Sequence, residues 1–227
     1  MTSSPLSTPA LPPDARPAHE RVYQALRLRI LHGALAPGQA VTVRGLAEAL
    51  DVSMTPAREA VRRLIAERAL AMTPTGRVQA PVMGARTLAE LTVARALLEP
   101  ELAARALPHA DARLLERLRA RDSAVNAALR AGDPGAYVRA NTAFHATLYA
   151  AAQAPALVAL VESVWLQLNP SMRVVAGRAG TLRLADHHAQ ALAALAARDE
   201  TALRAAIRAD VDQAMALLAQ AESVAAP

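Results

Sequence analysis

Four polar side chains that can bind a metal ion interrupt the apolar pattern of the C-terminal two thirds of the sequence: Asn141, His145, His188 and Asp210. Asn141 and His145 are four residues apart, a spacing that places both on one face of a helix. His188 and Asp210 lie ten and twelve residues on either side of Arg198, so an antiparallel helical hairpin that turns there brings them level. If the helix of His145 packs on that hairpin, two imidazoles and a carboxylate meet, and these can hold a divalent metal ion. Each histidine taken singly is more typical of an ordinary core or surface position.

The helices that would position these side chains are predicted from apolar periodicity. They cover residues 87–106, 111–131, 134–151, 156–176, 181–197 and 200–221. Asp133, which precedes Pro134, and Asp199 are residue types that cap helix N-termini. The chain is 53% hydrophobic but only 2% aromatic, which favours closely packed helices over a β-sandwich. We therefore predict an antiparallel bundle of about six helices over residues 83–227.

A second informative stretch runs from Leu46 to Leu64 and predicts two helices joined by a tight turn at residues 51–53. Thr55 is the expected N-cap of the second helix and Pro56 its first residue. Apolar residues of that helix recur at helical spacing and should pack inward: Ala57, Ala60, Val61 and Leu64. Its arginines remain on or beside the outer face: Arg58, Arg62 and Arg63. A helix that enters a DNA groove needs this arrangement, although a solvated surface helix would show it too.

The flanking sequence completes a winged helix. A helix is predicted from Ala18 to Gly33, a short strand at residues 41–43, and two further strands at 70–73 and 77–80. Arg77 then lies on the wing, where it can reach a phosphate or the minor groove. Residues 18–82 hold nine arginines against five acidic residues, whereas residues 83–227 hold fifteen against fourteen. The basic excess therefore lies in the predicted DNA-binding domain.

The remaining features concern the cellular setting. Residues 1–17 contain five prolines and are expected to form a disordered tail. The chain has no cysteine, which excludes disulfides and thiolate metal ligands. No apolar run approaches the roughly 20 residues that span a bilayer, and no secretion signal is recognisable. We expect a mainly α, cytoplasmic protein that does not bind membranes.

The order of the N-terminal elements resembles the DNA-binding domain of the GntR family of bacterial transcription regulators. The resemblance rests on four segments: Ile30–Gly33, Pro37–Gly38, Leu46–Ala47 and, above all, Val52–Val61. In that family, arginines that match Arg44 and Arg58 contact operator DNA. The resemblance therefore implies a DNA-binding set of Arg44, Ser53, Met54, Thr55, Pro56, Arg58, Arg62 and Arg77. Met54 stands where the family usually has arginine, and because methionine cannot pair with guanine, an unusual half-site is expected.

The helical part is similar to the FCD domain, the ligand-sensing domain of FadR-type GntR regulators. In that family an Asp, the His four residues later and two further His residues bind zinc, nickel or manganese, and the matching positions are Asn141, His145, His188 and Asp210. Asn141 and Asp210 depart from the pattern, which implies weaker binding and a preference for ions that favour oxygen ligands, or loss of the site. Such domains commonly sense small carboxylates. Arg95 matches a family arginine and Arg173 is a second candidate for the carboxylate, whereas a salt bridge from Arg95 to Glu99 is the structural alternative.

These features predict a homodimeric transcription regulator, most simply a repressor, that binds double-stranded operator DNA and a small organic acid. Two alternatives stay open. Two histidines and a carboxylate also form the site of non-haem iron oxygenases, although such sites normally lie in a β-barrel and no run of strands is predicted here. The helical domain could also be a metal-free sensor that holds its ligand by arginines alone. Since no hydrolytic or nucleotide-binding motif is recognisable, we do not expect an enzyme.

Overall fold

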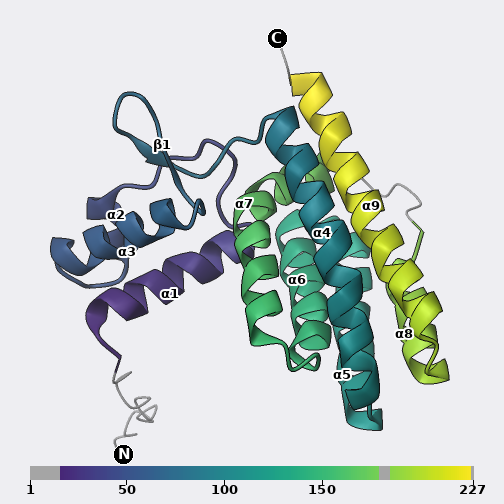
Figure 1. Ribbon diagram of the computed structural model, residues 1–227. Helices are drawn as coiled ribbons and strands as arrows, with labels where there is room; N and C mark the ends of the chain where they lie inside the picture. The colour runs from purple at the N-terminus through teal and green to yellow at the C-terminus, as the bar shows by residue number, and fades with distance from the viewer. Residues whose placement is uncertain (1–15, 179–184, 226–227) are drawn as a thin grey trace, which may run out of the picture.

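The computed structural model describes residues 16–178 and 185–225, which form a winged-helix part followed by a helical bundle (Figure 1). The winged-helix part contains α1 (Ala18–Leu31), α2 (Val43–Ala49), α3 (Met54–Ala66), β1 (Ala71–Met72) and β2 (Val78–Gln79). The bundle contains α4 (Ala85–Ala106), the 3-10 turn η1 (Leu107–His109), α5 (Ala112–Ala131), α6 (Pro134–Ala150), α7 (Pro155–Arg178), α8 (His187–Ala197) and α9 (Glu200–Ala225). The mainly α fold predicted from the sequence is confirmed. The division at residues 82 and 83 stays a prediction, and residues 1–15 of the predicted tail lie outside the described residues.

The winged-helix part differs from the sequence prediction at two helix starts. Residues 41–43 do not form a strand, because the Thr42 hydroxyl accepts a hydrogen bond from the Gly45 N–H (3.1 Å) and caps α2 instead. Directly before this segment, Ala40 forms an isolated antiparallel β-bridge with Gln79. The second correction concerns α3, whose N-cap is Ser53. Thr55 and Pro56 therefore lie inside the first turn of that helix.

The hairpin of the wing is shorter than predicted. Its strands β1 and β2 pair in antiparallel register, with Ala71 opposite Gln79 and Met72 opposite Val78. Gly76 adopts a φ of +80° in the connecting turn, a conformation that suits glycine. The turn holds Arg77 on its exposed side.

Local sequence explains where the bundle helices begin. The side chains of Asp111, Asp133, Asp186 and Asp199 accept hydrogen bonds from the first-turn N–H groups of α5, α6, α8 and α9. The first part of the predicted 181–197 helix, residues 181–184, lies outside the described residues. The helix that the structure describes there, α8, begins at His187 and so places His188 in its first turn.

A continuous apolar core joins the two parts of the molecule. The same cluster of buried residues contains Leu26 and Ile30 of α1, Leu148 of α6 and Leu166 of α7. Figure 1 shows the C-terminal end of α1 reaching α7 at the side of the bundle. Among the described helices, none is long and apolar enough to cross a membrane. The winged helix is thus attached to the bundle through α1 as well as through the chain that leads to α4.

Candidate functional site

Three of the four predicted metal ligands meet inside the bundle. His145 of α6, His188 of α8 and Asp210 of α9 place one ligand atom each within 4.8 Å of the other two. The His145 Nε2 atom lies 3.1 Å from Asp210 Oδ2 and 3.3 Å from His188 Nε2, and His188 Nε2 lies 3.8 Å from Asp210 Oδ1. Both histidines are buried. The hairpin of α8 and α9 therefore brings His188 and Asp210 level, as their spacing about Arg198 requires.

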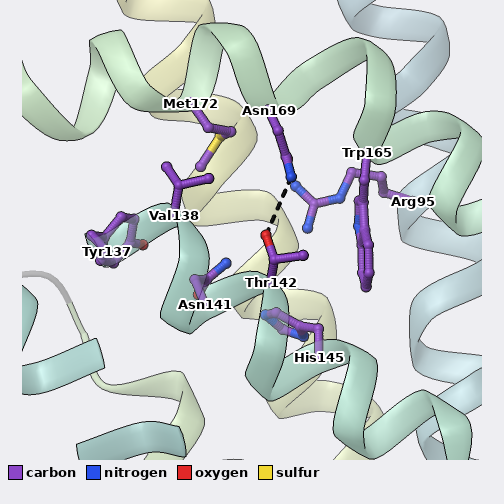
Figure 2. A pocket seen from close by; sticks show the side chains of 9 residues that line it. All are labelled: Arg95, Tyr137, Val138, Asn141, Thr142, His145, Trp165, Asn169 and Met172. Carbon is purple, nitrogen blue, oxygen red and sulfur yellow. Dashed lines mark hydrogen bonds between the residues drawn. The ribbon is translucent and has the colours of Figure 1, made fainter. Parts of the chain in front are cut away.

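The fourth predicted ligand, Asn141, lines two cavities that adjoin this cluster. We call the first the inner cavity; it is lined by Arg95, Tyr137, Val138, Asn141, Thr142, His145, Trp165, Asn169 and Met172 (Figure 2). The second, the acidic cavity, includes Asp122, Asp186, His188 and Asp210 in its wall. Among the residues that the structure describes, Arg95 is the only formally charged one in the lining of the inner cavity, whereas those that line the acidic cavity include three carboxylates and no arginine. An anion therefore finds a more favourable potential in the inner cavity.

A buried hydrogen-bond relay sets the proton position on His145. The Tyr149 hydroxyl donates its single proton to Glu99 Oε2 (2.8 Å), so its oxygen can only accept from His145 Nδ1 (3.1 Å). Glu99 is an acceptor because the guanidinium of Arg95 donates to it from 2.6 Å. Burial by itself raises the pKa of the Glu99 carboxyl, but the charge and hydrogen bond of Arg95, together with the charge of His145 and the hydrogen bond from Tyr149, outweigh burial and hold that pKa below its usual value. In its neutral form, with the proton on Nδ1, His145 directs the Nε2 lone pair at the cluster.

His188 is held in the same way from the opposite side. Its Nδ1 atom lies 3.3 Å from the Asp122 carboxylate of α5, which can only accept. The ring of Phe144 stacks on the imidazole at 3.9 Å between centroids with planes 14° apart. Ring orientation and the neutral tautomer are therefore both fixed, and a neutral His188 directs its Nε2 lone pair at the cluster.

Two imidazole lone pairs and a carboxylate that point at one another repel unless a cation lies between them. Ligand atoms bound to one metal ion at about 2.1 Å are separated by about 3.0 to 3.4 Å, which two of the three distances match. With neutral histidines, Arg95 balances Glu99, while Asp122 and Asp210 leave two negative charges. A divalent ion neutralises that remainder, so the residues present fit such an ion.

Without a metal ion, a shared proton satisfies the same geometry. Burial by itself raises the pKa of the Asp210 carboxyl. The hydrogen bond from His145 and the charges of His145, His188 and Arg95 outweigh burial and hold that pKa well below its usual value. Asp210 is therefore an anion in either case, as a metal ligand must be.

The two arginines assigned to the effector lie in different places. Arg95 lines the inner cavity, yet its guanidinium is already paired with Glu99, which is the salt-bridge alternative considered from the sequence. Arg173 does not line either cavity and donates instead to the carbonyl oxygen of Gly33 (3.3 Å). Tyr137 lines both cavities, and burial together with the charge of Asp210 raises the pKa of its phenol to about 12. The inner cavity thus offers neutral hydrogen-bond donors beside a partly neutralised cation.

The predicted DNA-reading helix α3 exposes the residues assigned to it. Its inward face buries Ala57, Ala60, Val61 and Leu64. Arg58 and Arg62 are exposed on that helix, and Arg77 is exposed on the wing. Within the described part of the chain, no ion pair or side-chain hydrogen bond engages these three guanidinium groups. Ser53, Met54 and Thr55 are exposed at the start of the helix and Pro56 is half-buried, so the N-terminal turn is open to a ligand.

Two other arginines of this part have partners of their own. Arg44 of α2 is exposed and pairs with Glu48 at 2.8 Å. Arg63 pairs with Glu20 and Glu67, and its guanidinium carbon lies 3.6 Å from the centre of the Tyr23 ring. Arg44 can exchange its exposed partner for a phosphate at little cost. Arg63 instead ties α3 to α1 and has a structural position.

Sequence reasoning missed the outer partners of the histidines. Tyr149 lies four residues after His145, so their hydrogen bond could have been predicted from helical spacing. Trp165 is buried and donates its indole N–H to Glu99 Oε1 (3.1 Å). No sequence pattern predicted the role of Asp122, because its contact with His188 joins two helices that are far apart in the sequence.

Comparison with known protein families agrees with this geometry. Residues 90–213 match the FCD domain, and residues 18–78 match the gntR family of bacterial regulatory proteins. FCD domains can bind metal ions, and the group formed by His145, His188 and Asp210 lies within the matched range.

Individual relatives match over nearly the whole chain. The HTH-type transcriptional regulator McbR of Escherichia coli strain K12 is 29% identical over 203 residues, which are 88% of this chain and 92% of that protein. The solved structure of E. coli McbR/YncC superposes with a TM-score of 0.83 at 28% identity, over 91% of this chain and 99% of that one. A GntR transcriptional regulator from Rhodococcus sp. RHA1 gives a TM-score of 0.73 at 25% identity, over 89% and 98% of the two chains. The chain therefore belongs to the GntR family of transcription regulators and joins a GntR helix-turn-helix domain to an FCD ligand-binding domain.

Proposed function

We propose that this regulator is a homodimeric repressor whose FCD domain binds a small organic acid through a divalent metal ion. His145, His188 and Asp210 would hold the ion, and Asn141 would supply a further oxygen. Zinc, nickel and manganese are the candidate ions. When bound, the ion supplies positive charge and open coordination positions for a carboxylate. The observation that carries the proposal is the convergence of two imidazole Nε2 atoms on the Asp210 carboxylate at 3.1 to 3.8 Å.

The metal-free alternative has less support from the same residues. It needs arginines that are available to a carboxylate, but Arg95 is paired with Glu99 and Arg173 donates to Gly33. The oxygenase alternative needs a surrounding β-barrel. In residues 16–178 and 185–225 the only sheet is the two-stranded wing. The relatives are transcription regulators, and we propose that this chain is likewise not an enzyme.

On the DNA side we propose that Arg58 and Arg44 contribute most to operator binding. Arg62 and Arg77 would contact phosphates, and the exposed start of α3, from Ser53 to Pro56, would face the groove. Two copies of the winged helix match the two-fold symmetry of a typical operator. Binding of the acid would favour a spacing of the paired DNA-binding domains that fits the operator less well and would release the DNA.

Elemental analysis of protein purified without chelator tests the metal centre. We expect about one divalent ion per chain in the parent and a loss of that ion in Asp210→Ala. Asp212→Ala is the matched control, because Asp212 lies on the same helix but is exposed and paired with Arg208. Light scattering on the same samples measures the oligomeric state. Equal metal content in Asp210→Ala and Asp212→Ala, or no metal in the parent, contradicts the proposed centre.

A further inference from the structure

The C-terminal end of α1 is held by side chains that belong to the wall of the inner cavity. Carbonyl groups in the last turn of a helix have no partner within that helix. The Leu31 carbonyl accepts from Asn169 Nδ2 (2.5 Å) and from the Thr142 hydroxyl (3.4 Å). Asn169 Nδ2 also donates to Thr142 Oγ1 at 3.2 Å, the contact drawn in Figure 2. The DNA-binding part is thus hydrogen-bonded directly to the effector cavity.

The same two side chains line the cavity that His145 of the candidate metal site also lines. Thr142 follows Asn141 and precedes His145 by one helical turn on α6. Asn169 follows Trp165 by one turn on α7. Figure 2 shows the side chains of Arg95, Asn169 and Thr142 converging around the cavity. A ligand that occupies this cavity beside His145 therefore lies in the same space that Thr142 and Asn169 line.

We propose that Thr142 and Asn169 form a latch between effector and DNA-binding domains, and that an anionic ligand in the inner cavity opens it. A side-chain amide has two N–H donors, and those of Asn169 are directed to Leu31 and Thr142. A carboxylate in the cavity can gain an Asn169 hydrogen bond only by taking one of these. Hydrogen bonds to an ionised acceptor are roughly twice as strong as those between neutral groups. The exchange therefore favours release of the Leu31 carbonyl. The effect of the ligand, which we call the trigger, rests on the proposed effector site. The hydrogen bonds from Thr142 and Asn169 to Leu31, which form the latch, do not depend on that site.

The residues around the latch are closely packed, so its side chains have little room for intermediate positions. Gly33 adopts a φ of +62°, and a Cβ atom there would lie 3.1 Å from Val138 Cγ1 and 3.2 Å from the Asn169 carbonyl oxygen. Pro170, directly after Asn169, lacks the N–H that would continue the hydrogen-bond ladder of α7. The neighbouring Ser171 hydroxyl is buried and has no partner among the described residues.

Hydrogen exchange on the full chain, without ligand, tests the latch. The reporters are the backbone amides of Gly33 and Ala34, which close the end of α1 by bonding to Ile30 and Arg29. Thr142→Val and Asn169→Leu keep the side-chain shape and remove the donors. We expect each variant to speed exchange at the reporters by about 3- to 10-fold, the effect of one net hydrogen bond.

Thr147→Val is the matched control. Thr147 lies on the same helix and is buried, but its hydroxyl donates to its own backbone at Ala143 and lines neither cavity. This control should leave exchange at Gly33 and Ala34 unchanged. Equal exchange in the latch variants, the control and the parent overturns the latch.

The same exchange experiment with added ligand tests the trigger. The probes are succinate at millimolar concentration and Ni²⁺, and calorimetry measures their binding. In the parent, bound succinate should speed exchange at the reporters, and in Asn169→Leu it should add nothing. Bound succinate that leaves the reporters of the parent unchanged overturns the proposal. If neither probe binds, the proposed effector fails by itself, while faster exchange in the latch variants still supports the latch.

Discussion

At the scale of single residues, each histidine of the cluster is useful because its outer nitrogen is already occupied. Tyr149 fixes His145 and Asp122 fixes His188, so both Nε2 atoms are directed inward. Outer partners of this kind typically change metal affinity 10- to 100-fold. We therefore expect Tyr149→Phe and Asp122→Asn each to weaken Ni²⁺ binding by about that factor in calorimetric titrations.

Glu116→Gln is the control for Asp122→Asn, because Glu116 is an exposed acid on the same helix. It should bind Ni²⁺ as the parent does. Unchanged affinity in both test variants would mean that the outer partners do not position the ligands.

The arginines of the winged helix should separate into two classes. Arg58→Ala should cost about 1 to 3 kcal/mol of binding and relax sequence preference, because Arg58 is assigned to the groove. Arg62→Ala and Arg77→Ala should weaken binding alike on all sequences and lower the salt-dependence slope by about one. Titration of a duplex selected by the parent from a random library, at several salt concentrations, measures both quantities. Arg86→Ala, an exposed arginine on α4, should change neither.

At the scale of elements, the sequence predicted helices well and their exact starts less well. Periodicity located the bundle helices because each has to bury one long apolar face. Side-chain caps were recognised where an aspartate precedes the helix, as at Asp133 and Asp199. Thr42 was misread as part of a strand because β-branched residues suit strands, while its capping bond to Gly45 depends on the local fold.

The candidate site was only partly predictable for a related reason. Spacing within one helix or one hairpin anticipated His145, His188 and Asp210. Contacts between distant helices, such as Asp122 with His188 and Asn169 with Leu31, depend on packing that no local pattern encodes. The hydrogen bond from Arg173 to the Gly33 carbonyl is another contact of this kind.

Two glycines allow a matched test of how tightly α1 docks on the bundle. Gly33 and Gly132 both have a φ of +62°, so replacement by alanine carries a similar conformational cost of about 1 kcal/mol at each. A Cβ atom at Gly132 meets nothing within 4 Å, whereas one at Gly33 meets Val138, Asn169 and Arg173. Gly33→Ala should therefore lower the free energy of unfolding by at least about 1 kcal/mol more than Gly132→Ala in urea titrations. Equal losses of unfolding free energy in the two variants would show that the residues around Gly33 move aside at little cost.

At the scale of the whole molecule, the buried charges predict how stability depends on pH. The folded pKa values of Glu99 and Asp210 lie below those of unfolded carboxyls, which are about 4.3 and 3.9. Their contribution is therefore complete above those unfolded values and is lost as the pH falls through the folded ones. Thermal melts of metal-free protein should show a Tm that falls steeply below about pH 4. Asp210→Asn should melt lower at neutral pH but depend less on acid, and a Tm that rises in acid would contradict this assignment.

The docking of α1 also has a mechanical consequence. The helix has 14 residues and is thus a rigid rod of about 20 Å, fixed at one end by the bundle and packed along its length on α3. A tilt of about 10° at the docked end moves the far end by roughly 3.5 Å, close to the rise of one base pair. If release of the Leu31 carbonyl tilts α1 by this amount, the far end of the helix is displaced by about one base-pair step.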